Sequence, residues 1–178
     1  MNAYKLKTVQ LDWHTVNADL QQYQHEPATT ILNPALTWEI DYTQYGYNEH
    51  NTKIWKKIMP ISGWAQQLVQ QLPLDNPQVQ LTRQDPGQVL PRHVDRFFML
   101  RKNFPNDTRP TVRLLVYLED WKAGHQLCLD QGMIYNWNQG DVWMWPPETA
   151  HIAANTGIEP KWTCNVTGFV NDKNTCNW

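Results

Sequence analysis

The fold class is decided by the stretch Thr111-Val112-Arg113-Leu114-Leu115-Val116-Tyr117-Leu118, which is the clearest β-strand in the chain. It is apolar over most of its length, as is typical of a central strand in a sheet. Shorter segments of β character surround it, and Gly or Pro residues mark several of the turns between them. They cover residues 78–83, 88–95, 126–130, 141–145, 151–155 and 161–170. This series predicts a mainly β protein with the double-stranded β-helix, or jelly-roll, fold.

The 178 residues fit one domain, which we expect to combine two parts. About residues 78–170 form the jelly-roll core, and about residues 1–77 form an N-terminal supporting region. Within that region, residues 10–20 leave helix and strand open, and residues 36–42 alternate like a strand.

One supporting helix is predicted over residues 65–72, with Ser62 as its cap and Pro73 as its stop. The apolar side chains of this segment recur four positions apart, so one face of the helix should be buried. That face consists of Trp64, Leu68 and Leu72.

The composition excludes several classes of protein. With 15 basic and 17 acidic side chains, the chain offers no electrostatic case for binding nucleic acid or an anionic membrane. Three cysteines without a CxxC spacing indicate neither a disulfide framework nor a zinc–thiolate site. The N-terminus lacks the apolar stretch of a signal peptide, and no segment reaches transmembrane length. We therefore expect a cytoplasmic protein.

Three residues form the candidate metal site: His93 and Asp95 on one predicted strand, and His151 at the start of a later one. Side chains at i and i+2 of a strand point the same way, so His93 and Asp95 can reach one ion together. Two imidazoles and one carboxylate are the ligand set of the facial triad that binds non-haem Fe(II). The alternative is that the first two are exposed turn residues and that His151 is a surface histidine.

The motifs around these residues resemble the Fe(II)/2-oxoglutarate-dependent oxygenase superfamily, in the style of its aspartyl/asparaginyl and prolyl hydroxylase branches. The resemblance covers roughly residues 78–170 and is carried by the segments 87–95, 113–118 and 140–145 together with His151 and Lys161. It implies that His93, Asp95 and His151 bind iron, and that no further catalytic residue is needed beyond these ligands. Fe(II), 2-oxoglutarate and O2 would be the cofactor and co-substrates, and succinate and CO2 would be released. The presence of Asp95 favours hydroxylation over halogenation, because halogenating relatives lack this carboxylate.

The same resemblance assigns the co-substrate contacts. Lys161, ten residues after His151, holds the position of the basic residue that pairs with the far carboxylate of 2-oxoglutarate. Arg113 lies in an apolar strand, where a charge is costly unless it is paired, so it either contacts the co-substrate or pairs with a structural carboxylate. Tyr117 on the same strand face and Thr82 on an earlier strand are further candidates.

Substrate contacts are less well defined by the sequence. Arg96 begins a predicted loop over residues 96–110 that is either a lid or a solvated connection. Trp143 and Trp145 share a strand face and either line a substrate pocket or pack between the two sheets, and packing is the commoner role.

The sequence thus predicts a hydroxylase that acts on a small molecule or on a peptide or protein side chain such as Pro, Asp or Asn. Two alternatives stay open: a cupin-like metal oxygenase that uses no 2-oxoglutarate, and a non-catalytic jelly-roll binding module. Neither a nucleic acid nor a membrane is expected as a partner.

Overall fold

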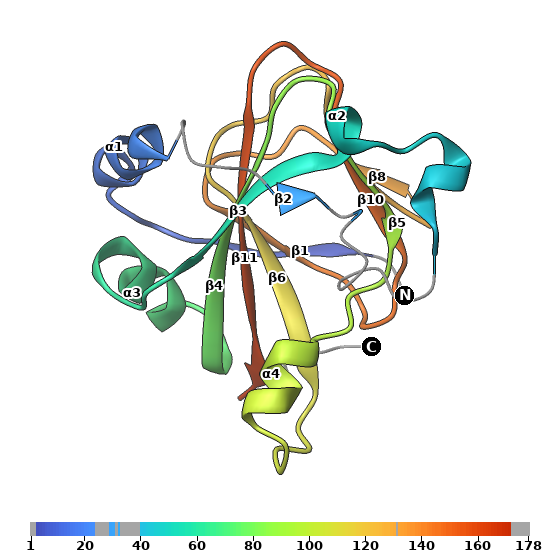
Figure 1. The fold of residues 1–178 in the computed structure, drawn as a ribbon. Helices are drawn as coiled ribbons and strands as arrows, with labels where there is room; N and C mark the ends of the chain where they lie inside the picture. Colours follow the sequence, from blue (N-terminus) through green and yellow to red (C-terminus); the bar gives the residue numbers. More distant parts are fainter. Residues whose placement is uncertain (1–2, 24–28, 31, 33–39, 131, 172–178) are drawn as a thin grey trace.

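The structure, a computed structural model, describes residues 3–23, 29–30, 32, 40–130 and 132–171, and in this part the protein is built mainly from two antiparallel sheets (Figure 1). The large sheet has the strand order β1-β9-β6-β11-β4-β3-β2, and the small sheet has the order β5-β10-β7-β8. The strands of the large sheet are β1 (Tyr4–Thr8), β2 (Thr29–Thr30), β3 (Lys53–Met59), β4 (Leu74–Gln84), β6 (Thr111–Tyr117), β9 (Asp141–Met144) and β11 (Lys161–Val170). Those of the small sheet are β5 (Val89–His93), β7 (His125–Leu129), β8 (Gly132–Ile134) and β10 (His151–Asn155). The predicted jelly-roll fold class is confirmed.

Two helices, α1 (Trp13–Gln22) and α3 (Gly63–Gln70), lie on the side of the large sheet that faces away from β5 and β10 (Figure 1). The segment that left helix and strand open is therefore helical. Asp12 caps α1, because its side chain accepts a hydrogen bond from the Thr15 amide at 3.3 Å. The remaining helices are short: η1 (Tyr42–Tyr45), α2 (Glu49–Thr52) and α4 (Phe98–Asn103).

The helix predicted from residue 65 begins two residues earlier, at Gly63. Ser62 precedes it, but its side chain makes no capping hydrogen bond, so the predicted cap is wrong in its chemistry. The helix also ends two residues early, at Gln70, so the predicted buried face is confirmed for Trp64 and Leu68, while Leu72 is buried just beyond the helix. Burial against the sheet, rather than capping, therefore stabilises this short helix.

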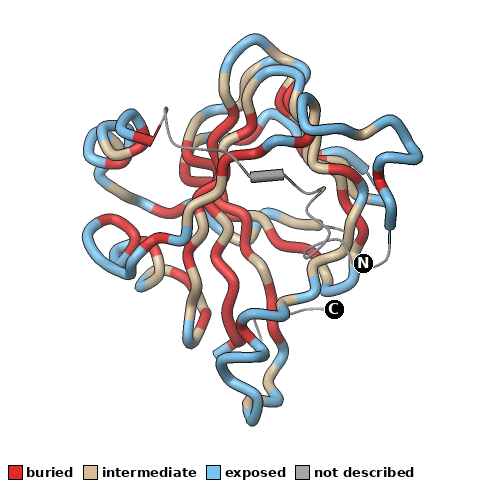
Figure 2. The backbone as a smooth tube through the Cα atoms, viewed as in Figure 1, coloured by how far each residue is buried: buried red, intermediate tan, exposed pale blue. Residues whose placement is uncertain are grey.

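Two hydrophobic clusters divide the core, and the buried residues follow the strands of the large sheet (Figure 2). The larger cluster joins α1 and α3 to the outer face of the large sheet, and the smaller lies on the other face, between the sheets. Strand β11 illustrates the difference between the two faces of the large sheet. Its residues Trp162, Cys164 and Val166 belong to the larger cluster, so the alternate residues face the space between the sheets. These inner residues are polar: Lys161, Thr163, Asn165 and Thr167.

Other expectations differ from the structure. Most of the strand predicted over residues 36–42 lies outside the described residues, and Tyr42 belongs to η1. The predicted loop over residues 96–110 contains the short helix α4. The sequence pattern gave no indication of β1, β3 or β8, of which β3 is a seven-residue strand inside the large sheet.

Candidate metal centre

His93 and His151 are brought together by strand pairing in the small sheet. His93 is the last residue of β5, His151 is the first of β10, and the two lie directly opposite each other in the antiparallel register. Their ring centroids are 4.3 Å apart. Asp95 joins them, and the potential ligand atoms of the three residues all lie within 4.8 Å of one another. The structure therefore brings together the three residues that the sequence had grouped.

Both imidazoles are oriented by backbone carbonyl groups. The Nδ1 atom of His93 lies 2.7 Å from the Pro91 carbonyl oxygen, and the Nδ1 atom of His151 lies 3.0 Å from that of Thr149. A carbonyl oxygen can only accept, so each Nδ1 must carry the proton. This tautomer leaves the Nε2 lone pair of each ring free, which is the form that a metal-ligating histidine adopts.

Burial keeps His93 neutral. Loss of solvation, reinforced by the neighbouring His151, lowers the pKa of His93 to about 4. A proton therefore does not compete with a metal for this ring at neutral pH.

Asp95 is positioned by Arg113 rather than by a strand. The predicted strand over residues 88–95 ends at His93, so the i, i+2 argument for Asp95 was wrong in its mechanism. Instead, Nη1 of Arg113 donates to Oδ1 of Asp95, while Nε of Arg113 donates to Oγ1 of Thr167 at 3.2 Å. Arg113 thus pairs with a carboxylate, and that carboxylate is the candidate ligand.

The second carboxylate oxygen of Asp95 is left without a partner. Oδ2 is buried, accepts no hydrogen bond from any described residue, and lies 3.9 Å from Nε2 of His151. A buried carboxylate oxygen without a partner is costly, and a cation would remove that cost. Adjacent ligands around a metal at roughly 2.1 Å are about 3 Å apart, so binding needs only a small contraction. The donor set and its spacing fit a divalent metal with open coordination positions.

The tryptophans near the site are mainly packing residues. Trp145 is buried in the cluster between the sheets, and its ring lies 5.1 Å from that of His151. Trp143 packs against the same cluster, which agrees with the packing interpretation. Trp162 instead lies on the outer face of the sheet, with its ring 5.4 Å from that of Trp55.

Lys161 is buried between the sheets. Only 2 % of it is exposed, and its Nζ atom donates to the backbone carbonyls of Gln126 at 2.6 Å and Ala154 at 3.3 Å. Burial lowers the pKa of Lys161 to about 7. An ammonium group has three N–H donors, so one remains for a further acceptor.

Several polar groups on the inner surface have no partner in the described part of the chain. They are Oη of Tyr117 and the indole Nε1 atoms of Trp137 and Trp143, all buried. Tyr117 stacks on Trp137 with ring centroids 3.8 Å apart, and burial raises its pKa, so its hydroxyl stays protonated. Unsatisfied buried donors of this kind are rare, and they suit an interior that receives a polar ligand.

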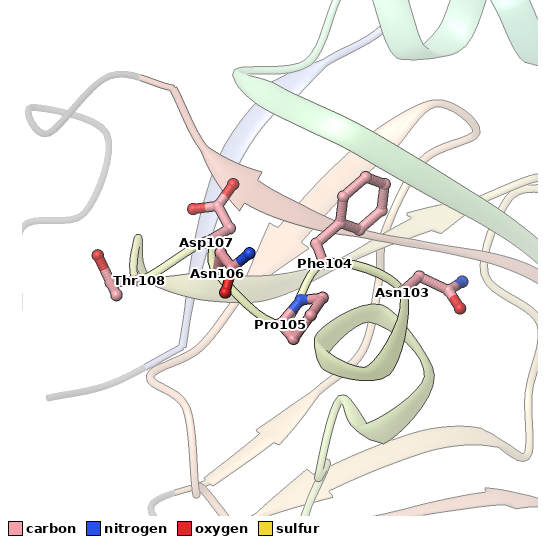
Figure 3. Close-up of a pocket in the computed structure, with 6 residues that line it drawn as sticks. All are labelled: Asn103, Phe104, Pro105, Asn106, Asp107 and Thr108. Carbon is pink, nitrogen blue, oxygen red and sulfur yellow. The ribbon is translucent and has the colours of Figure 1, made fainter.

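The remaining predicted residues are placed less informatively. Thr82 is buried on β4, and its hydroxyl oxygen accepts from Nδ2 of Asn165 at 3.2 Å. Arg96 is exposed after the end of β5, and the structure does not associate it with the metal ligands. A surface hollow outside the metal centre is lined by consecutive residues of the turn after α4, from Asn103 to Thr108 (Figure 3).

The sequence-based reasoning missed one charged residue of the site, Lys56. It lies on β3 directly opposite Thr82 and within electrostatic range of Asp95, Arg113 and His93. No sequence signal marked it, because β3 itself was not predicted.

The fold is similar to that of a known hydroxylase. A Pseudomonas putida prolyl-4-hydroxylase superposes with a TM-score of 0.61 at 16% sequence identity, covering 94% of this chain and 91% of that one. More distant similarity links the chain to a cupin 2 conserved barrel protein of Rhodopseudomonas palustris, with a TM-score of 0.41, 13% identity, and 68% of this chain and 64% of that one covered. The KdgF protein of a Halomonas species gives a TM-score of 0.40 at 14% identity, covering 69% of this chain and 84% of that one.

At the level of sequence, no protein-family model matches the chain, and no curated protein matches it. Within the described residues, none of the helices is both long enough and apolar enough to cross a membrane.

Proposed function

We propose that this protein is an Fe(II)- and 2-oxoglutarate-dependent oxygenase that hydroxylates a C–H bond of its substrate. The observation that carries the proposal is the convergence of three free ligand atoms, Nε2 of His93, Nε2 of His151 and Oδ2 of Asp95. The similarity in fold to a prolyl-4-hydroxylase supports it. A protein side chain such as Pro, Asp or Asn, or a free amino acid, is the proposed class of substrate.

The chain's own residues would prepare the site for this chemistry. Pro91 and Thr149 hold the two imidazoles in the ligating tautomer, and Arg113 fixes one oxygen of Asp95 while leaving the other free. The ring of Trp145, 5.1 Å from that of His151, would limit access of water to the ligands. With iron, 2-oxoglutarate and O2 bound, oxidative decarboxylation of the co-substrate would supply the oxidant for the C–H bond.

Lys161 and Tyr117 are the residues we assign to the far carboxylate of 2-oxoglutarate. The third N–H of the Lys161 ammonium group and the unpartnered hydroxyl of Tyr117 can both donate to an anion. A lysine gives a less rigidly oriented contact than the arginine found in many of the oxygenases that the sequence resembles.

A metal oxygenase that needs no 2-oxoglutarate is the second candidate. It is favoured by the two backbone carbonyls that already accept from Lys161, since they allow this side chain to be a brace between the sheets. On that account, removing the Lys161 charge would lower stability without changing any requirement for 2-oxoglutarate.

The direct test is aerobic incubation of the protein with Fe(II) and 2-oxoglutarate against pools of peptides and metabolites. We expect succinate to form together with a product about one oxygen atom heavier than its precursor. The His93→Ala variant is the control, because it removes a ligand. Equal product formation by the wild type and this variant would contradict the proposal.

A further inference from the structure

Lys56 ends a row of polar side chains that crosses the inner face of the large sheet. The strand registers place Lys56 opposite Thr82, Thr82 opposite Thr163, and Thr163 opposite Tyr117. Directly opposed residues of antiparallel strands project from the same face, so the four side chains share the space between the sheets. Lys161 lies one step along the same face of β11 from Thr163.

Lys56 is a cation without a counterion in the described part of the chain. It is half-buried and makes no hydrogen bond or ion pair with any of the described residues. Burial and the charge of Arg113 lower its pKa, against an opposing effect of Asp95. Arg113 cannot serve as a second free cation, because Asp95 already neutralises it. An unpaired charge in a partly buried position indicates that a bound ligand supplies the opposite charge.

Lys56 lies near the part of β3 at which a substrate would enter. The inner-face residues of this strand pass from Ile54, which is 1 % exposed, through half-buried Lys56 to Ile58, which is 65 % exposed. The inner face of the sheet therefore opens to solvent at the Ile58 end. Lys56 lies one two-residue step along this face from that opening, and it is close enough to Asp95 and His93 for their charges to influence one another.

The co-substrate does not account for both lysines. Under the proposed function, one carboxylate of 2-oxoglutarate is bound at the metal, and only the far carboxylate needs a cation. Lys56 and Lys161 are separated by two inter-strand spacings and one two-residue step, roughly 12 Å between Cα atoms. A five-carbon diacid with one end at the metal engages only one of them, and the other remains for the second substrate.

We propose that Lys56 binds a carboxylate of the primary substrate, so that the oxygenase acts on an acidic molecule or residue. This inference rests on the proposed function of the metal centre and specifies its substrate class. The neighbouring Thr82 supports it, because the Thr82 hydroxyl accepts from Asn165 and its own proton has no acceptor among the described residues. One ammonium group and one hydroxyl donor suit a singly charged carboxylate.

The test is a calorimetric titration of acids and their matched amides into the protein with Fe(II) and 2-oxoglutarate under anaerobic conditions. One arm compares free L-amino acids with their α-carboxamides, and the other compares blocked Asp and Glu with blocked Asn and Gln. We expect at least one acid to bind roughly ten- to a hundredfold more tightly than its amide. The arm that shows the preference distinguishes an α-carboxylate from an acidic side chain.

Lys56→Met should abolish the preference for acids and change the affinity for 2-oxoglutarate much less, by about threefold or less. The matched control is Lys57→Met, because Lys57 lies next to it on β3 but places its Nζ atom over the Tyr23 ring, 4.0 Å from the centroid, on the opposite face. This control should retain the preference.

Three results would overturn the inference: no acid bound more tightly than its amide, a preference that persists in Lys56→Met, or a loss of 2-oxoglutarate affinity in that variant as large as the loss of acid affinity. The same titrations on metal-free protein separate this inference from the proposed function. A preference for acids that depends on Lys56 but needs neither iron nor 2-oxoglutarate supports the carboxylate site even if the oxygenase proposal fails.

Discussion

Arg113 is the residue on which the geometry of the metal centre depends most. It holds Asp95 beyond the end of β5, where no strand hydrogen bonds constrain the backbone, and it is itself held by Thr167 on β11. The carboxylate is thereby fixed with one oxygen occupied and one free. An apolar side chain in place of Arg113 would leave Asp95 buried and unpaired.

The variant Arg113→Met should therefore destabilise the metal-free protein by about 1–3 kcal/mol, the cost of a buried group left without its partner. Adding Mn(II) should recover part of that loss, because the metal supplies the missing positive charge. Denaturant unfolding with and without Mn(II) measures both effects. The matched control is Arg109→Met, since Arg109 pairs with Asp107 and Asp75 near the surface and should contribute about 1 kcal/mol or less. An equal loss with and without the metal would contradict the assignment.

Lys161 gives a second prediction at this scale. If its ammonium group binds the far carboxylate, Lys161→Met should weaken 2-oxoglutarate binding roughly ten- to a hundredfold. The wild-type affinity should fall as the pH rises above about 7, because the free side chain then loses its proton, and the variant should lack this dependence. Anaerobic calorimetry across pH measures both. Lys122→Met is the control, because Lys122 pairs with Glu119 and Glu159. An unchanged affinity for 2-oxoglutarate in Lys161→Met would favour the oxygenase that uses no 2-oxoglutarate.

The connection between β10 and β11 links the candidate metal ligand His151 to Lys161. The side chain of Asn155 holds this connection together. Its Nδ2 donates to the backbone carbonyls of Gln84 at 2.9 Å and Glu159 at 2.7 Å. Its Oδ1 accepts from the Gly157 amide at 3.0 Å. Gly157 also lies against the loop before β7, where an added Cβ would be 2.3 Å from the Ala123 carbonyl oxygen. The turn is thus held against β7, which supplies one of the carbonyls that bind Lys161.

Gly157→Ala should therefore destabilise the fold by about 1–3 kcal/mol, through crowding rather than through backbone strain. Gly87→Ala is the complementary control: its Cβ meets nothing within 4 Å, but its φ of +84° disfavours a side chain. Because the first change displaces the β10–β11 turn, it should also weaken 2-oxoglutarate binding, whereas Gly87→Ala should change stability alone. Thermal unfolding measures the stability of both variants, and calorimetry measures their affinity for 2-oxoglutarate. A Gly157→Ala protein of wild-type stability would show that the β10–β11 turn and the loop before β7 separate easily.

The sequence predicted those helices and strands whose residue pattern is recognisable within a short stretch of chain. The strands from β4 onward, except β8, were recognisable by apolar runs and turn residues, and the antiparallel pairing of β5 and β10 brought His93 and His151 together. Strand β3 was missed because Lys53, Lys56 and Lys57 interrupt its pattern on both faces. This segment forms a strand because it pairs with β4, and a single sequence does not show such a pairing. Pairing with a carboxylate was one alternative that the sequence left open for Arg113, but the role of Lys56 and the identity of Asp95 as that carboxylate depend on such distant pairings and were not predictable.

The two faces of the large sheet separate most of the apolar core from the candidate functional residues. The outer face and the helices that cover it hold most of the apolar core, whereas the inner face combines the smaller aromatic cluster with polar residues from β3, β4, β6 and β11. The predicted cytoplasmic location, and the predicted absence of nucleic-acid and membrane partners, stay predictions.

Polar groups buried on the inner face should make the stability of the metal-free protein depend on pH. The pKa of Lys161 falls from its ordinary value of 10.5 to about 7 on folding, so between these values the unfolded chain binds more protons than the folded one. Stability should therefore rise with pH across this window and be lost as the pH falls through about 7. Lys161→Met should remove this part of the dependence, and denaturant unfolding from neutral to alkaline pH would reveal it; an unchanged slope in the variant would assign it to other groups.

We propose that His93, Asp95 and His151 hold an iron ion that binds 2-oxoglutarate. The most direct test of this proposal is an anaerobic calorimetric titration of 2-oxoglutarate into the protein with and without Fe(II), repeated with Asp95→Ala. We expect the wild type to bind 2-oxoglutarate only when Fe(II) is present, and the variant to bind it in neither condition. Binding that is independent of iron, or that is unaffected by the loss of Asp95, would contradict it.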